Sequence, residues 1–551
     1  MMKKIEKQID KNSIILVSIG LGTIIYLLYF PVFSFPFHNW DDGTYIYKNN
    51  MICRGLNWET VKWAFTTNYF GFYYPLTWLS HATDVSIFGL SPKGHYLHNI
   101  VLHFLNALLL YIFLLFVQKD ICRALMVAVI FAVHPMNVES VAWLAERKNL
   151  LATFFMLLTL LFYYLYQRKE TQNKSSKIIY YFLSLSFYFA GLISKSSIVM
   201  LPLLLILFDI WPFKRINTSQ KLNIKAFLNI LKDKIIFFIL SLFSGVVTIF
   251  AQKELKAIVS FDVIPFSQRV GEAVLSLWFY ILKYFFPFNL AVFYEHHRGK
   301  YPFWKPFAIA TVIIVILFIF FRAFKKRSQL LIGFIFFLIS LLPVLGFIQV
   351  GLQGKADRYV YLPYWGLSII LIYGFLSDKI IKNKLLFFSL LGAIVVYFFT
   401  ISHQQIKVWE SDKTLFENVV KVQPKSFLGY LKLGNYYYFK ENYDKALENY
   451  LKASQFNHNE PLIYCNIGTL YYFKKNYNEA LSYYDQSINI NPKYAEAYYW
   501  KGVVLMEKRE YEKSLSFLMK AKEMGYYENN ISEKIQEVEN IIKKGNYKYV
   551  K

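Results

Sequence analysis

Acidic residues beside apolar runs are the groups of this 551-residue sequence that could carry out chemistry. Asp41 and Asp42 stand together between Trp40 and Tyr45, soon after the first apolar run, residues 13–30. Charges are unfavourable next to a hydrocarbon layer. The pair is therefore either a solvated loop or part of a reaction centre, where a carboxylate can accept the proton of an attacking hydroxyl.

A second polar segment, "HPMNVESVAWLAERKNLL" (residues 134–151), contains further acidic and basic groups. Pro135 suits the first turn of a helix. Glu139, Trp143 and Glu146 then follow at i, i+4 and i+7, so we expect them on one helix face. The interval from His134 to Glu139 differs from the zinc-binding spacing of a metalloprotease helix.

A third polar segment, "QGKADRYVYLP" (residues 353–363), separates two apolar runs near the end of the hydrophobic region. The topology expected from the basic loops places Asp357 and Arg358 at the same membrane surface as the acidic pair. The three cysteines, Cys53, Cys122 and Cys465, are too far apart to form a metal or redox motif.

The composition favours a membrane protein: 56% of the residues are hydrophobic, 20% are aromatic, and the mean hydropathy is +0.32. The net charge of +25 does not indicate nucleic-acid binding, because most lysines and arginines lie in short loops beside apolar runs. Residues 406–551 are polar and contain no run long enough to span a bilayer. We expect a polytopic membrane domain (1–405) and a separate C-terminal domain (406–551).

The basic loops determine the expected topology. Residues 273–288 carry Lys283 in mid-run, and counting them as a span would move the basic loop 322–329 to the outer face. We therefore expect an interfacial or re-entrant helix there. This predicts about eleven spans: 13–30, 98–117, 123–134, 149–166, 178–193, 197–211, 235–251, 306–321, 330–347, 363–377 and 385–401. The basic loops 1–12, 167–177, 214–234, 322–329 and 377–384 lie inside, and residues 31–97, 134–148, 252–305, 348–362 and the C-terminal domain lie outside.

The C-terminal domain repeats itself every 34 residues, as Gly434, Gly468 and Gly502 show. Aromatic and small residues recur at fixed offsets from these glycines. This period and pattern predict tetratricopeptide repeats near 427–460, 461–494 and 495–528, which form an α-solenoid. The expected fold class is all-α throughout.

Residues 39–50, 72–110, 134–151 and 356–363, followed by these repeats, resemble the transmembrane and tetratricopeptide-repeat O-mannosyltransferases and their bacterial relatives. That family belongs to the GT-C superfamily of glycosyltransferases. The resemblance implies inverting transfer of a mannose-like sugar from a polyprenyl-phosphate donor, at the outer membrane surface, to a serine or threonine of an exported protein. The repeats would recruit the acceptor polypeptide.

The resemblance also implies site residues. It places the catalytic base on the first member of the acidic pair, Asp41, with Asp42 as the alternative. Arg358 is the expected ligand of the donor phosphate, since a developing phosphate charge needs a cation. Further candidates for substrate binding are Glu139, Asp357, His134, Arg147, Lys148 and Lys195. No metal site and no required cofactor are expected.

Other readings of the sequence are less favoured. A membrane-anchored repeat scaffold with an inactive membrane domain is the main alternative, but the acidic pair and the "ADR" segment disfavour it. A transporter would show charges within spans and an internal duplication. Residue usage indicates a bacterial inner membrane with the site and the repeats facing the periplasm. Nucleic acid is not an expected partner.

Overall fold

The computed structural model describes residues 11–168, 173–215, 228, 230–255, 257–297, 299, 301–351, 353–527 and 530–546. The chain forms two compact units, Met1–Ser411 and Asp412–Lys551. The boundary expected at residue 405 falls within helix α19 (Lys384–Val408), so the first unit extends to the end of that helix. The basic segments expected at 1–12, 167–177 and 214–234 lie partly outside the described residues.

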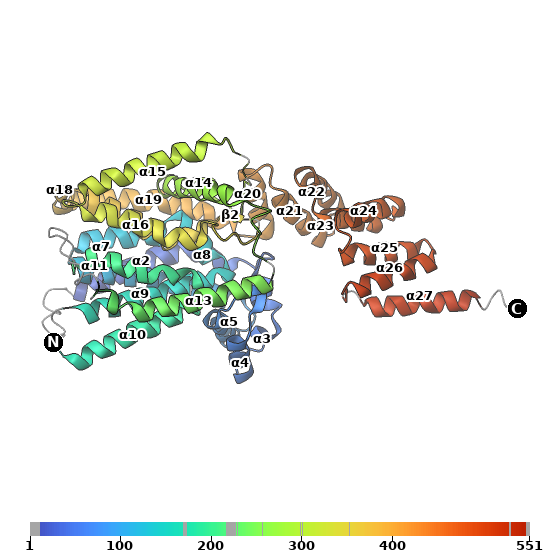
Figure 1. The fold of residues 1–551 in the computed structure, drawn as a ribbon, viewed down its shortest axis with the longest axis horizontal. Coiled ribbons are helices and arrows are strands. Elements are labelled where there is room, and N and C mark those ends of the chain that lie inside the picture. Colours follow the sequence, from blue (N-terminus) through green and yellow to red (C-terminus); the bar gives the residue numbers. More distant parts are fainter. Residues whose placement is uncertain are drawn as a thin grey trace. The chain divides into compact units, whose positions relative to one another are not determined.

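Helices build both units, as the sequence predicts (Figure 1). The one strand pair of the described residues is β1 (Tyr294–Glu295) with β2 (Gln353–Lys355), which run antiparallel with Tyr294 opposite Lys355. A single bridge joins Ile258 to Val350. These contacts connect the loop regions 252–305 and 348–362, two of the segments expected on the outer face.

Six helices of the described residues are long and apolar enough to cross a membrane. They are Asn12–Ser34, Pro92–Gln118, Leu144–Gln167, Ile235–Glu254, Trp304–Ala323 and Lys384–Val408. A bent pair, Ile121–Val133 with Pro135–Ala142, adds a seventh if its 55° break lies within one span. The structure therefore supports six or seven spans by length and composition, fewer than the expected eleven.

Broken or short helices account for four of the five expected spans that are not among the six. The fifth, 178–193, corresponds to α10 (Lys174–Leu192), which is long but not among the six. Pro135 follows α7 (Ile121–Val133), and the apolar helices Ser196–Ile210, Ser328–Val344 and Tyr364–Phe375 have fewer than 18 residues. Proline lacks an N–H group and interrupts helical hydrogen bonding, and an apolar run in the sequence does not reveal such breaks. The helix at 273–288, α14 (Phe266–Phe285), is not among the six.

Burial separates the central from the peripheral helices of the first unit. The most apolar 18-residue stretches of α6 (Pro92–Gln118) and of Leu144–Gln167 are each 56% buried. The corresponding stretches of α13 (Ile235–Glu254) and α15 (Trp304–Ala323) are 17% and 11% buried. Figure 1 shows α15 at the upper edge of the bundle. Continuous exposed apolar helix surface of this kind is suited to contact with lipid.

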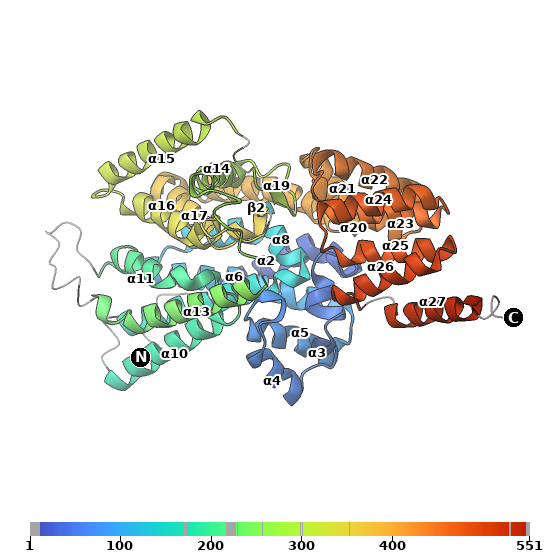
Figure 2. The same cartoon turned by 45° about the vertical axis from the view of Figure 1, so that its right-hand side comes forward.

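The segment 31–97 folds as a group of short helices beside the long ones (Figure 2). It contains η2 (Gly43–Tyr47), α3 (Asn50–Cys53), α4 (Trp58–Thr66) and α5 (Pro75–Phe88). The side chains of Asn49 and Asn57 accept backbone N–H groups at the starts of α3 and α4. Such caps satisfy groups that a helix end leaves unpaired.

The second unit is an array of antiparallel helix pairs. After α20 (Asp412–Val422), the repeat helices are α21 (Phe427–Phe439), α22 (Tyr443–Phe456), α23 (Pro461–Phe473), α24 (Tyr477–Ile490), α25 (Ala495–Glu507) and α26 (Tyr511–Glu523). A Cβ atom at Gly468 would lie 2.8 Å from the Tyr484 ring, and one at Gly502 2.8 Å from Leu518. The 34-residue spacing of glycines is therefore the spacing of close helix contacts.

Replacing Gly468 by alanine should destabilise the array by about 1–3 kcal/mol, because the added methyl group displaces the buried Tyr484 ring. Amide hydrogen exchange of α23 and α24 measures this loss of protection. Gly545→Ala in α27 (Ile531–Asn546) is the matched control, since no atom lies within 4 Å of its added Cβ. Equal protection in the two variants would show that the Gly468 contact is not limiting.

Candidate active site

Asp42 joins two of the polar segments. Its side chain is fully buried; Oδ2 accepts the backbone N–H of His38 at 2.9 Å and Oδ1 accepts that of Ala145 at 3.1 Å. Burial raises the pKa of Asp42 to about 6, against the opposing effects of His38 and of the two N–H donors. Both carboxylate oxygens therefore accept backbone N–H groups, and Asp42 connects the acidic loop to residues 144–146. Asp41 is only half-buried.

Glu146 is the centre of a cluster of cations. Its Oε1 lies 3.0 Å from the Lys148 ammonium and 3.3 Å from Nε of Arg358, and its Oε2 lies 3.1 Å from the Lys195 ammonium. The carboxylate is 2% exposed, while the three cations are 8–11% exposed. Three separate regions of the chain thus bring their positive groups to one point, and each cation retains some access from outside.

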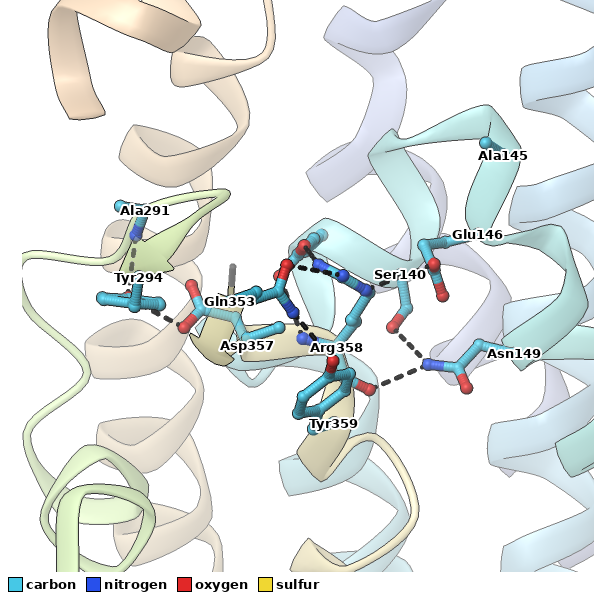
Figure 3. Close-up of polar contacts among 12 residues, drawn as sticks. Ser140, Ala145, Glu146, Asn149, Ala291, Tyr294, Gln353, Asp357, Arg358 and Tyr359 are labelled. Carbon is cyan, nitrogen blue, oxygen red and sulfur yellow. Dashed lines mark hydrogen bonds and ion pairs between the residues drawn. The ribbon is translucent and has the colours of Figure 1, made fainter. Parts of the chain in front are cut away.

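Arg358 is held in place from several sides (Figure 3). Glu139 accepts its backbone N–H at 2.9 Å and its guanidinium at 2.5 Å. The guanidinium also donates to Gln353 at 3.0 Å and lies 5.0 Å from the ring centre of Trp143. A guanidinium with fixed partners presents its remaining donors in a defined direction, as recognition of a phosphate requires.

Asn149 connects the cations to each other. Its amide nitrogen donates to the Arg358 carbonyl at 2.8 Å and to Ser140 Oγ at 3.2 Å, and its oxygen accepts from Lys195 at 3.0 Å. Figure 3 shows Asn149 and Glu146 on one side of Arg358 and Asp357 on the other. The amide sets the spacing between Lys195 and the Arg358 segment.

Asp357 lies beside the cluster and is held by Tyr294. It is buried, and Tyr294 donates its hydroxyl proton to Oδ1 at 2.9 Å. Burial and the neighbouring charge of Glu139 raise the pKa of Asp357 well above its ordinary value. Within the cluster itself, three cations contact two carboxylates, Glu139 and Glu146.

The acidic loop lies beside this cluster. The Lys148 ammonium is 3.3 Å from the Tyr45 hydroxyl and 4.4 Å from the ring centre. Burial raises the pKa of Tyr45; the charges of Asp41 and Glu146 raise it further, and that of Arg358 lowers it. The charges of the acidic loop and of the cluster therefore both act on Tyr45, and Asp41 lies close enough to the cluster for their charges to interact.

The predicted continuous helix over 139–146 is wrong. Helix α8 (Val138–Ala142) ends before Trp143, which is extended (φ −99°, ψ 114°), and the 3-10 turn η5 (Leu144–Glu146) follows. Glu139 and Glu146 still meet, because each contacts Arg358. The break frees the Ala145 N–H group for Asp42, a contact that a regular helix would have excluded.

His134 does not join the site. Its Nε2 pairs with the Tyr284 carbonyl at 3.1 Å, its Nδ1 accepts the Met136 N–H at 3.2 Å, and its ring stacks on Tyr284. These contacts cap the turn that begins at Pro135. His134 thus stabilises the bend between α7 and α8 rather than facing the cations.

Arg147 also points elsewhere. It is fully buried and donates to Asp84, to Asn99 at 2.9 Å and to the His95 carbonyl at 2.7 Å. Within the described residues, His81, Asp84 and His95 form the one group with metal-ligand spacing, their candidate atoms lying within 4.8 Å of each other. Arg147 binds the Asp84 oxygen that also faces His95, so we assign this group to holding Arg147.

The structure thus brings together Arg358, Glu139, Lys148 and Lys195 of the expected residues, with Asp357 beside them and the acidic pair next to Tyr45. Sequence reasoning did not assign a role to Glu146, Asn149 or Gln353. Glu146 and Asn149 flank the basic pair Arg147–Lys148 in a segment that was already singled out. Gln353 is the first residue of the third polar segment, where nothing distinguished it from its neighbours.

The family profiles that match this chain lie in the second unit. Family profiles described as tetratricopeptide repeat match residues 461–494 and 483–516, and one described as TPR repeat matches 434–475. No curated protein matches the chain.

Similar solved structures include the first TPR of Spaghetti (RPAP3) bound to the HSP90 peptide SRMEEVD. It has 19% identity and a TM-score of 0.21, over 21% of this chain and 92% of that one. MamA has 19% identity and a TM-score of 0.20, over 28% and 86%. The APC/C hetero-tetramer Cut9–Hcn1 has 11% identity and a TM-score of 0.24, over 84% and 89%. Together with the helix pairs and their 34-residue period, the profile matches show that residues 434–516 belong to the tetratricopeptide-repeat family.

Proposed function

We propose that this protein is a membrane glycosyltransferase of the GT-C type. It transfers a mannose-like sugar from a polyprenyl-phosphate donor to a hydroxyl group, on Ser or Thr of exported polypeptides. The observation that carries the proposal is the convergence of Arg358, Lys148 and Lys195 on one carboxylate, Glu146, next to a loop with two carboxylates. Such a cluster is suited to a phosphate group.

The proposed chemistry assigns one role to each group. Asp41 accepts the proton of the acceptor hydroxyl, the hydroxyl oxygen forms the new bond to the anomeric carbon, and the bond from that carbon to the phosphate oxygen breaks. The bonding electrons leave with the lipid phosphate, whose added charge Arg358, Lys148 and Lys195 stabilise. Asp42 holds the loop, because both of its oxygens are engaged by backbone N–H groups. Glu139 orients Arg358.

The proposed location is a membrane, with the lipid tail of the donor in the bilayer and the site at the outer, periplasmic surface. Six apolar helices and the exposed apolar surfaces of α13 and α15 support this placement. We propose that the repeat array recruits the acceptor polypeptide, since stacked repeats offer extended surfaces for protein partners. The reaction requires no cofactor in this scheme.

Asp41→Asn should lower the rate of sugar transfer by about 10²–10⁴-fold, the usual contribution of a general base. Asp42→Asn should lower it less at equal amounts of folded protein. An amide cannot accept both N–H groups, so that variant loses loop stability instead, by about 1–3 kcal/mol. The measurement is turnover of a polyprenyl-phosphate sugar with a Ser/Thr peptide by purified protein. If the rate of sugar transfer falls less than tenfold in both variants, the acidic pair is not the catalytic group and the proposed reaction is rejected.

Arg358→Ala should weaken donor binding by about 2–4 kcal/mol, because the phosphate loses a charge-assisted contact. Arg358→Lys should recover only part of this, since an ammonium cannot reproduce the two-pronged geometry. Titration with a polyprenyl-phosphate sugar measures both. Arg54→Ala is the control, as Arg54 forms an exposed ion pair with Glu59. Unchanged binding in Arg358→Ala would remove Arg358 from the donor site.

Donor affinity should fall as the pH rises through 8. Burial lowers the pKa of Lys195 to about 8, although the charge of Glu146 partly opposes this. Below that pH Lys195 is charged and attracts phosphate; above it the charge is lost, so affinity should fall up to about tenfold by pH 9. Lys195→Arg keeps its charge at this pH and should bind with little change from pH 7 to 9. A fall of equal size in both proteins would assign the effect to another group.

A further inference from the structure

We propose that Glu146 makes the cation cluster select a singly charged phosphodiester over a doubly charged phosphomonoester. The inference deepens the proposed function and rests on it. A lipid-linked sugar phosphate is a diester with one negative charge, whereas the lipid phosphate released by transfer is a monoester. At neutral pH a monoester carries about −1.5 to −2, because its second pKa is about 6. Substrate and product thus differ mainly in charge.

The position of Glu146 is the first support. Each of its two oxygens is engaged by cations, Oε1 by Lys148 and Arg358 and Oε2 by Lys195, at 3.0–3.3 Å. A carboxylate held this way occupies the point where an anion would otherwise be attracted most strongly. It is 2% exposed and has no exit to solvent of its own.

The charge balance is the second support. Glu139 is committed to Arg358 through two hydrogen bonds, one to the backbone N–H and one to the guanidinium. Glu146 is therefore the carboxylate that offsets the charge shared by Lys148, Lys195 and Arg358. With its charge present, the cluster attracts a second negative charge on the ligand less strongly. Without it, the cluster would favour the monoester and hold the product in the site after transfer.

The fixed geometry is the third support. Lys148 donates to the Ala145 carbonyl at 2.8 Å, Lys195 to Asn149 at 3.0 Å, and Arg358 to Gln353 at 3.0 Å. The cations are therefore held by groups other than Glu146 as well. Removing the charge of Glu146 should leave them in place and change the potential of the site rather than its shape.

Direct binding of two probes with the same tail tests this inference: a short polyprenyl phosphate and its methyl diester, titrated at pH 7.5. Glu146→Gln should tighten binding of both, but of the monoester by an additional factor on the order of 10–100, because the second ligand charge doubles its interaction with the removed carboxylate. Glu146→Asp keeps the charge and should retain the wild-type preference. Glu59→Gln removes an exposed carboxylate and should leave the affinity for both ligands unchanged.

Turnover supplies a second readout on the full-length protein. In Glu146→Gln, inhibition by added polyprenyl phosphate should strengthen at least about tenfold, and the rate at saturating donor should fall as product release becomes slow. Folding is checked by size-exclusion chromatography and thermal unfolding. If Glu146→Gln does not fold, Glu146→Asp still distinguishes the two cases, because loss of the diester preference with the charge retained overturns the inference.

The outcomes separate the inference from the proposed function. One outcome would overturn the role of Glu146 alone. In it, the wild-type protein binds both lipid phosphates, Arg358→Ala binds neither, and Glu146→Gln has the same ratio of monoester to diester affinity as the wild type. Wild-type protein that binds neither lipid phosphate would overturn the donor site itself, and the inference with it.

Discussion

The contact between Arg358 and Glu139 is the constraint on which the candidate site depends. It joins two segments separated by more than 200 positions in the chain and buries both charged groups. A buried guanidinium is costly unless its donors are satisfied. Here Glu139 takes the backbone N–H and one side-chain donor, Gln353 another, and the rings of Trp143 and Tyr359 face its planar group. The pair therefore fixes the backbone of both segments as well as one side chain.

Other parts of the site follow from the same contact. Because α8 ends at Ala142, residues 143–146 are free to turn back toward Arg358, which places Glu146 among the cations and the Ala145 N–H against Asp42. The short β1–β2 pairing holds the Arg358 segment from the other side. A regular helix through residues 138–167 would bring neither the acidic loop nor Lys195 to this place.

The sequence is a good guide where a regular period exists and a poor one where the backbone breaks. The 34-residue period is correct because each glycine marks a close contact between two helices, as at Gly468 and Tyr484. The all-α fold is also correct. The span number is not supported, since proline breaks and short helices are hidden within apolar runs. The predicted helix face of Glu139, Trp143 and Glu146 is wrong for the same reason, although the two carboxylates meet through Arg358.

The site and the array are close along the chain. Trp409, which ends α19, stacks on Trp143 with ring centres 6.0 Å apart and meets the His38 ring at 5.6 Å. Trp143 faces Arg358, and the His38 N–H binds Asp42. Only Glu410 and Ser411 separate Trp409 from α20, the first helix of the second unit. Trp409 thus contacts the same residues that order the candidate site. In the proposed enzyme, an acceptor recruited by the repeats is tethered by a short linker, which raises its effective concentration near the acidic loop.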